Sequence, residues 1–258
     1  MKKILLWGLL LLLVLVIAAG VTVHLFLDDA VKRGVETYGP DVTKVSVKLD
    51  TVNLALLSGS GKIKGLLIGN PEGYQSSSSI AVGTGSLGLK PASLLSDKIV
   101  VESIVLEAPM VTFETDLRGN NLSKILANLE GSSDKEPAKP SEPKPAETKP
   151  GKKYEVDDFL LKGAKLHVML NVLGGQSATV TLPDIHLQNL GKGADGLTAA
   201  EISKQVLQKI LDVSIEKATS VIADMSKGAT YVTPEMRKTA TNTVEKATKS
   251  ITDLFKKK

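Results

Sequence analysis

The sequence contains no cysteine and few aromatic residues. Without cysteine the chain can form neither disulfides nor thiolate metal sites, and a lipid-modified N-terminal cysteine is excluded. The aromatic content of 3% leaves little stacking surface for sugars or single-stranded nucleic acid. The formal net charge is only +4, and the tail from Pro234 alone carries seven Lys/Arg against three Asp/Glu. Nucleic acid is therefore not an expected partner.

Recognisable catalytic motifs are also missing. His167, Asp184 and His186 could meet across a hairpin as a metal site, but their spacing matches no known metal motif. The segment Gly83–Gly88 has the glycine pattern of a dinucleotide-binding loop, yet Pro91 follows it where a helix should begin. We therefore expect neither an enzyme nor a cofactor nor a metal site.

One long hydrophobic run is present, at the N-terminus. Ile4–Leu27 contains no charged residue; Lys2-Lys3 precedes it and Asp28-Asp29 follows it. As a helix the run would be about 35 Å long, enough to cross a hydrocarbon core of about 30 Å. The two lysines favour a cytoplasmic N-terminus, which places the body on the opposite side. We expect residues 1–27 to form a transmembrane anchor.

A cleaved signal peptide is the alternative interpretation of this segment. Ala18-Ala19-Gly20 supplies small residues of the kind found at cleavage sites. The apolar run continues past them to Leu27, where a mature N-terminus would ordinarily turn polar, so a retained anchor is favoured. In both cases the body is exported.

Residues 28–130 are expected to form an antiparallel β-meander closed by a short helix. Apolar and polar residues alternate along it, as they do in half-buried strands. The alternation slips between Leu49 and Val52, which suggests a bulge. The predicted strands cover residues 45–49, 52–56, 62–68, 80–89, 98–106 and 111–117. Helical spacing over 120–129 predicts the helix, and Asn121-Leu122-Ser123 is expected to open it rather than to serve as a glycosylation sequon.

Residues 131–153 are rich in proline, lysine and glutamate and contain no large apolar residue. Such a segment cannot bury enough surface to offset the entropy of ordering, so we predict a disordered linker. Alternation resumes over 154–192, which is expected to add further strands to the same sheet.

Residues 197–258 are expected to be amphipathic helices. Thr198 and Glu201 form a capping-box pattern, and Thr233-Pro234 would begin a second helix. The pair is expected to pack on itself or on the sheet. Alternatively, the second helix lies on an anionic membrane surface, and the basic candidates for that contact are Arg237, Lys238, Lys246 and Lys249.

Several segments resemble the AsmA-like family. Ser93–Val111 is similar to a segment that pairs two strands in the family repeat, and Asp116–Leu126 is similar to the segment that follows it. Ile63–Tyr74, which contains Asn70-Pro71-Glu72-Gly73, and Val156–Leu166 resemble further strands of the family. The expected fold class is α+β: an N-terminal transmembrane helix, an antiparallel curved β-sheet forming an AsmA-like groove, a short helix and a C-terminal helical pair.

The resemblance implies a single-pass protein of the bacterial inner membrane with its body in the periplasm. Larger members of the family are thought to form curved apolar β-grooves that move phospholipid toward the outer membrane. The implied function is non-enzymatic phospholipid binding or transport, or outer-membrane homeostasis. The implied partners are the inner membrane, phospholipid, and a larger envelope protein or a second copy.

The candidate groove lining is one alternating set of residues: Val45, Val47, Leu54, Leu56, Ile99, Val101, Ile104, Leu106, Val111 and Phe113. Ordinary core packing is the alternative role for each of them. At about 4.8 Å per strand the sheet is too short to bridge a periplasm alone. The alternative function is a non-catalytic envelope scaffold or adaptor that binds partners through its C-terminal helices.

Overall fold

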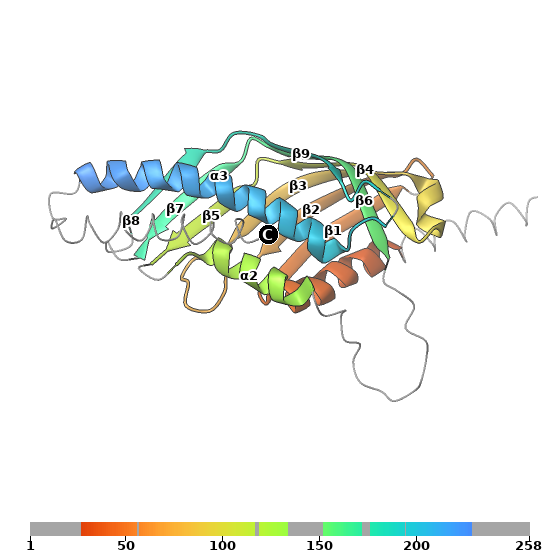
Figure 1. Ribbon diagram of the computed structural model, residues 1–258, viewed down its shortest axis with the longest axis horizontal. Coiled ribbons are helices and arrows are strands. Elements are labelled where there is room, and N and C mark those ends of the chain that lie inside the picture. The colour runs from red at the N-terminus through yellow and green to blue at the C-terminus, as the bar shows by residue number, and fades with distance from the viewer. Residues whose placement is uncertain are drawn as a thin grey trace, which may run out of the picture.

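A mixed nine-stranded sheet curls into a half-barrel, and helices lie across its open side (Figure 1). This computed structural model describes residues 27–55, 57–116, 119–133, 152–171, 176–193 and 195–228. The strands are β1 (Val47–Ala55), β2 (Ser60–Ile68), β3 (Ile80–Leu89), β4 (Lys98–Glu107), β5 (Met110–Thr115), β6 (Lys153–Lys162), β7 (Lys165–Leu170), β8 (Gln176–Thr181) and β9 (Ile185–Leu190). The helical segments are an α-helix over residues 27–43, η1 (Pro91–Leu95), α2 (Asn121–Ser133) and α3 (Ala199–Gly228).

Three long strands are each interrupted once and are therefore counted as two: β4 with β5, β6 with β7, and β9 with β8. The nine strands thus correspond to six long ones. β4 and β5 both pair with β3 and are separated only by Ala108-Pro109. β6 and β7 then pair with β4 and β5, and β9 and β8 pair with β6 and β7. The order across the sheet is therefore β1, β2, β3, β4/β5, β6/β7 and β9/β8.

The sheet is mixed, so the prediction of an antiparallel sheet is wrong in part. β6 and β7 run parallel to β4 and β5. Parallel neighbours need a long crossover connection, and the connection here contains α2. Alternation of apolar and polar residues reports only that a segment is a strand, not the direction of its neighbour.

A line of backbone irregularity crosses the sheet. Leu49 and Val52 of β1 are both buried although they are three residues apart, so the predicted phase slip is present. The β1–β2 pairing keeps one register throughout, so no residue is inserted. Instead, the backbone of β2 is distorted opposite the slip in β1. Gly65 of β2 has φ 65°, and a Cβ there would lie 2.0 Å from the Asp50 carboxylate of β1.

The same line continues through the interrupted strands. Ala108, with φ 44°, donates its N–H to the Lys162 carbonyl at 2.8 Å, and Lys165 donates to the Pro109 carbonyl at 2.9 Å. Gly163, with φ 62°, lies beside them in the chain between β6 and β7. Because kinks at matched positions bend neighbouring strands together, this line lets the sheet curl.

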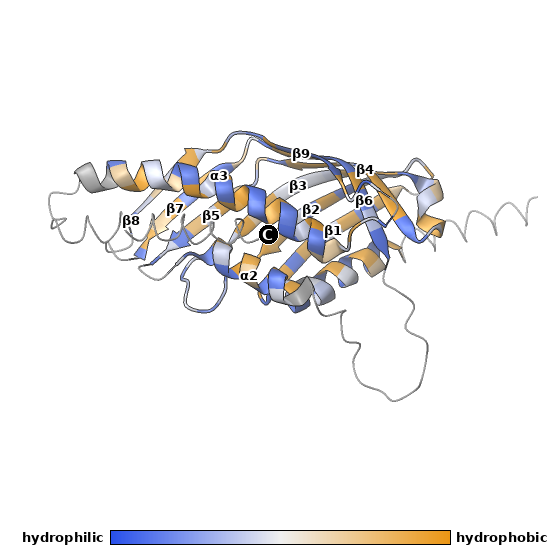
Figure 2. Cartoon of the chain, in the orientation of Figure 1, coloured by the Kyte–Doolittle hydropathy of each residue, from blue (hydrophilic) through white to orange (hydrophobic). Residues whose placement is uncertain are grey.

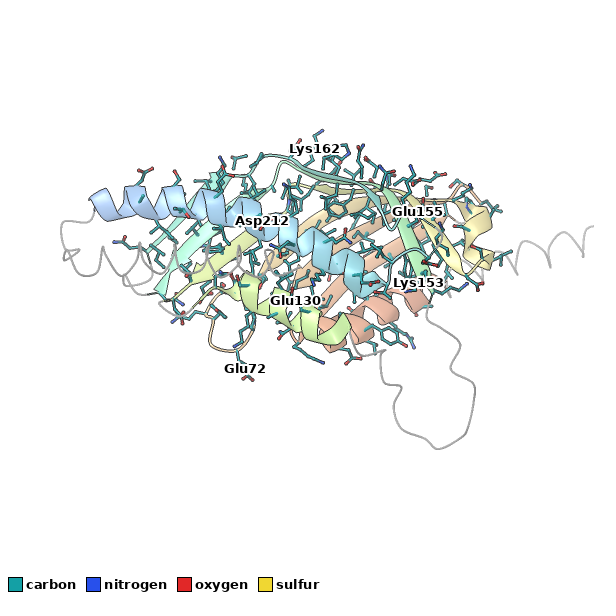
Figure 3. All side chains as sticks on the ribbon, viewed as in Figure 1. Glu72, Glu130, Lys153, Glu155, Lys162 and Asp212 are labelled. Carbon is teal, nitrogen blue, oxygen red and sulfur yellow. The ribbon has the colours of Figure 1, made fainter. Side chains whose placement is uncertain are left out.

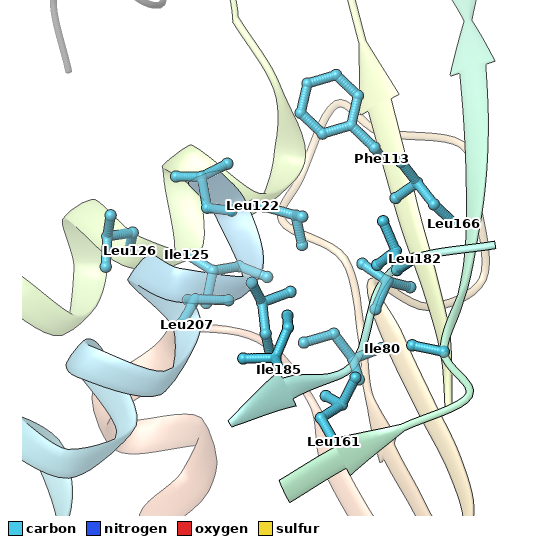
Figure 4. Packing of buried hydrophobic residues seen from close by; sticks show 14 of the residues in the cluster. Ile80, Phe113, Leu122, Ile125, Leu126, Leu161, Leu166, Leu182, Ile185 and Leu207 are labelled. Atoms are coloured by element: carbon cyan, nitrogen blue, oxygen red, sulfur yellow. The ribbon is translucent and has the colours of Figure 1, made fainter. Parts of the chain in front are cut away.

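The helices pack on three different parts of the half-barrel. α2 packs on β5 and on α3, and α3 packs on β7 and β9. Figure 4 shows Leu122 and Ile125 of α2 beside Leu207 of α3, with Leu161 and Ile185 of the sheet next to them. The helix over 27–43 packs on β1 instead, through a second cluster of buried residues.

The predicted capping box of α3 is confirmed. The Thr198 N–H donates to Glu201 Oε2 at 2.7 Å, and the Glu201 N–H donates to Thr198 Oγ1 at 3.2 Å. The Thr198 N–H and the Thr198 hydroxyl, which donates to the same oxygen at 2.9 Å, lower the pKa of Glu201 below its ordinary value. The helix begins where the sequence predicted because its first orphan donors are satisfied there.

Several predictions fall outside the described residues. They are the anchor up to residue 26, most of the linker, the second C-terminal helix, and its basic residues Arg237, Lys238, Lys246 and Lys249. In the described ranges no helix has the length and hydropathy needed to span a bilayer.

Candidate functional site

The inner face of the sheet carries continuous rows of apolar residues across the strands. Paired residues of neighbouring strands project to the same side, so register defines each row. One row is Leu54, Gly61, Leu87, Ile104, Phe159 and Leu187. The adjacent row is Val52, Ile63, Gly85, Leu106, Leu161 and Ile185. Beyond the bend line a third row is Val47, Ile68, Ile80, Val111, Leu166 and Val180.

Burial changes along these rows. In the first row Leu54 and Phe159 are each 4% exposed, whereas Leu87 and Ile104 between them are only half-buried. We call six of the half-buried inner residues of β2, β3 and β4 the central strip: Ile63, Leu66, Leu87, Leu89, Ile104 and Leu106. Ile68 and Ile99 are further half-buried residues, nearer the ends of β2 and β4.

The position of the helices explains the central strip. The helix over 27–43 packs on β1, α2 on β5, and α3 on β7 and β9. The central strands β2, β3 and β4 lie between these contacts, so the strip residues keep part of their surface exposed, whereas Val82 and Val101 of the same strands are buried. The strip is thus a part of the inner face that is only partly covered.

Two glycines make the central strip smooth. A Cβ at Gly85 would lie 2.9 Å from Leu106 and 3.0 Å from Ile63, and a Cβ at Gly61 would lie 2.7 Å from Leu54. The aliphatic side chains therefore lean over the glycines. The result is an even aliphatic surface, which can bury hydrocarbon but offers no group for acid–base or nucleophilic chemistry.

Charged residues occupy the other face. Lys62 and Lys64 alternate with Ile63 in β2, and Glu102 and Glu107 are exposed in β4. Figure 2 shows the resulting alternation of hydrophilic and hydrophobic colour along the strands. The inner face is therefore apolar and the outer face charged.

The predicted lining residues fall into two environments. Six are buried, with 0–8% of their surface exposed: Val45, Val47, Leu54, Val101, Val111 and Phe113. Ile99, Ile104 and Leu106 are half-buried and pack against the main cluster. Leu56 lies outside the described residues.

Sequence reasoning missed Leu66, Leu87 and Leu89, which lie in the central strip. Leu87 and Leu89 alternate with Ser86 and Gly88, so the strand period was visible. The surrounding glycines drew attention to a possible nucleotide loop instead. Gly83–Gly88 in fact lies within β3.

A buried polar network holds the loop between β2 and β3. Asn121 Nδ2 donates to Asn70 Oδ1 and to the Thr112 carbonyl, both at 2.8 Å, and Asn121 Oδ1 accepts from the Glu114 N–H at 3.0 Å. Asn121 is fully buried. Its side chain is therefore structural, and the loop that begins at Asn70 is tied to the start of α2.

Glu114 completes this network. One carboxylate oxygen accepts from the Gln75 N–H at 2.6 Å and from Asn171 Nδ2 at 2.7 Å, and the other accepts from the Ser76 N–H at 2.7 Å and from its hydroxyl. Burial alone would raise the pKa of Glu114, but the hydrogen bonds outweigh burial and hold its pKa below the ordinary value of 4.5. The residue was not predicted, because its partners are distant in sequence.

The three residues considered for a metal site do not converge. His167 Nδ1 lies 3.0 Å from Thr179 Oγ1, and Asp184 Oδ1 accepts from the Gly163 N–H at 2.8 Å. His186 instead pairs with Asp158, whose pKa this hydrogen bond lowers. Across the part of the chain that the structure describes, no group of three His, Cys, Asp or Glu could hold a metal ion.

Comparison of the chain with protein-family models, with curated proteins and with solved structures finds no match. The resemblance to the AsmA-like family therefore remains a prediction. Function has to be inferred from the geometry of the inner face itself.

Proposed function

We propose that this chain is a non-enzymatic, membrane-anchored protein of the bacterial envelope whose curled sheet binds phospholipid acyl chains. The role would be phospholipid transport or outer-membrane homeostasis. With residues 1–27 as the anchor, the N-terminus is cytoplasmic and the body lies in the periplasm. The observation that carries the proposal is the central strip, six half-buried aliphatic side chains on the inner face with no charged residue among them.

The dimensions of the strip suit an acyl chain lying along the strands. Along the strands the strip extends from Leu66, which pairs with Val82, to Leu89. From Val82 to Leu89 β3 rises roughly 20 Å, more than the ~15 Å that the acyl chains of one leaflet span. Each methylene removed from water contributes about 0.8 kcal/mol. Because burial of hydrocarbon is non-directional, binding needs no catalytic or metal-ligating residue.

Native mass spectrometry of the full chain in detergent tests the proposal. We expect phospholipid bound in stoichiometric amount, and we expect Ile104→Asp to remove it. Val105→Asp is the matched control, because Val105 is the next residue of β4, is also half-buried, and lies on the outer face. Lipid around the anchor should be unaffected by either substitution. Equal lipid in the two variants, with both folded by circular dichroism, would contradict binding on the inner face.

A non-catalytic scaffold is the second candidate. Part of the inner face is closed, since Leu161, Leu166 and Val111 are 0% exposed. A scaffold would use the sheet as a filled core and bind partners through the C-terminal helices. Absence of bound lipid in the unsubstituted chain would favour it.

A further inference from the structure

The β1–β2 turn and η1 meet at one end of the sheet. The Leu89 N–H donates to the Gly59 carbonyl at 2.5 Å. Gly59 has φ 67°, and a Cβ there would lie 2.1 Å from the Leu89 carbonyl and 3.1 Å from the Pro91 ring. The turn is therefore packed tightly against the start of η1.

Each of these two segments exposes a leucine almost completely. Leu57 in the turn is 102% exposed and Leu95 at the end of η1 is 96% exposed. The other large hydrophobic residues exposed in the described ranges reach at most 58%. A single exposed leucine is ordinary, but here two almost fully exposed leucines lie on two segments that contact each other.

Leu27, where the predicted anchor ends, lies at this same end. It packs against the cluster that contains Leu54. Asp28 Oδ1 accepts from the Leu54 N–H at 2.8 Å. Leu54 precedes Leu57 by three residues, so the predicted anchor joins the domain beside the exposed leucines.

Exposed lysines lie at this end. Lys62 and Lys90 are exposed, and exposed Lys152 donates from Nζ to the Ser96 carbonyl at 2.6 Å, next to η1. Exposed acids lie among them: Asp97 follows η1, Asp29 follows Asp28, and Glu102 follows Val101, the partner of Leu89. Figure 3 places Lys153 and Glu155 near the same end. After the Thr198 hydrogen bonds, the positive charge of Lys153 also helps to lower the pKa of Glu201.

We infer that this end of the sheet docks on the bilayer surface, with Leu57 and Leu95 inserted below the headgroups and the lysines level with anionic phosphates. Such a projection binds membrane by apolar burial together with attraction to anionic lipid. The inference depends on the anchor but not on lipid binding by the inner face. It also places Leu89, one end of the central strip, nearest the bilayer.

The lack of cysteine allows a direct test in the full chain. Single variants Leu57→Cys and Leu95→Cys carry an environment-sensitive fluorophore and are reconstituted in vesicles of phosphatidylethanolamine and phosphatidylglycerol. Both probes should show blue-shifted emission, quenching by spin-labelled lipid and loss of quenching by aqueous iodide. Ser177→Cys is the matched control, since it is exposed on β8 at the opposite end of the strands.

Probes at Leu57 and Leu95 that are as accessible to iodide as the probe at Ser177 would overturn the inference. All three sites are surface positions, so labelling should leave the fold intact. Lipid contact at these two sites in a protein that binds no lipid on its inner face would reject the proposed function while keeping the docking surface.

Discussion

The side chain of Asp28 accepts a hydrogen bond of 2.8 Å from the backbone N–H of Leu54. Leu54 lies in β1, an edge strand whose paired neighbour in the sheet is β2. Glu36 Oε1 accepts from the Leu49 N–H at 3.0 Å, and Lys32 donates to a β1 carbonyl at 3.0 Å. These three side chains recur every four residues on one helical face. The helix over 27–43 therefore covers the free backbone edge of β1, which would otherwise be open to pairing with another strand.

We expect Asp28→Ala to lower the free energy of unfolding by about 1 kcal/mol, because it leaves the Leu54 N–H without this acceptor. Hydrogen exchange at the Leu54 amide should become faster. Urea unfolding followed by circular dichroism gives the first quantity, and exchange mass spectrometry gives the second.

Asp29→Ala is the control for this substitution. Asp29 is exposed and lies 3.5 Å from Arg33 in a surface ion pair, which contributes at most about 0.5 kcal/mol. Equal effects of the two substitutions would show that Asp28 does not protect the edge.

The Asn121 network predicts a larger loss. Asn121→Ala removes partners from Asn70, from the Thr112 carbonyl and from the Glu114 N–H, all near a fully buried position. Leaving such groups unpaired should cost about 3 kcal/mol in urea unfolding. Asn53→Ala, at an exposed position of β1, should change stability by less than about 0.5 kcal/mol. A loss below about 1 kcal/mol for Asn121→Ala would argue against the network.

Glu114 predicts an acid dependence of stability. Its pKa is lowered in the folded protein, so the unfolded chain takes up a proton first as pH falls. The stability that the carboxylate contributes is therefore complete above pH 4.5 and is lost as pH drops through the lower folded pKa.

Glu114→Gln tests this dependence. The Gln75 and Ser76 N–H groups each donate to one of the two carboxylate oxygens. In the variant the amide NH₂ replaces one of these oxygens and faces a donor, which at neutral pH should lower the free energy of unfolding by about 2 kcal/mol. The difference between the two proteins should shrink as pH falls below 4.5. Glu102→Gln, at an exposed position of β4, should match the unsubstituted chain throughout. A constant difference between the Glu114→Gln variant and the unsubstituted chain across this pH range would contradict the assignment.

The capping box predicts a modest effect. Thr198→Ala removes the acceptor of the Glu201 N–H and should lower the free energy of unfolding by about 1 kcal/mol. Thr219→Ala, at an exposed site inside α3 where the hydroxyl only bonds back to Ile215, should be close to neutral. Reversal of this order in thermal unfolding would show that the box does not stabilise α3.

Much of the fold could be predicted from the sequence because strand period and helix caps are local signals. The predicted strand over 80–89 coincides with β3, and Thr198 and Glu201 form the predicted cap. The helix over 27–43 was missed for a physical reason. Polar side chains on the face toward the sheet form hydrogen bonds with the backbone of β1. The sequence therefore lacks the continuous apolar stripe of an ordinary amphipathic helix.

The parts of the site that were missed depend on distant contacts. Asn70 and Asn121 lie 51 residues apart, and no local pattern joins them. Which lining residues are buried also depends on which strands the helices cover. Ile104 and Val111 belong to the same predicted set, yet only Val111, on the strand under α2, is fully buried.

The most direct test of the account is a photocrosslink at Ile104. Benzoylphenylalanine replaces Ile104 in one full-length variant and Val105 in another, and each is irradiated in the membranes of a Gram-negative host. We predict a covalent phospholipid adduct, read as a mass increase, at position 104 and none at position 105. An adduct at both positions or at neither would contradict binding of acyl chains on the inner face of the sheet.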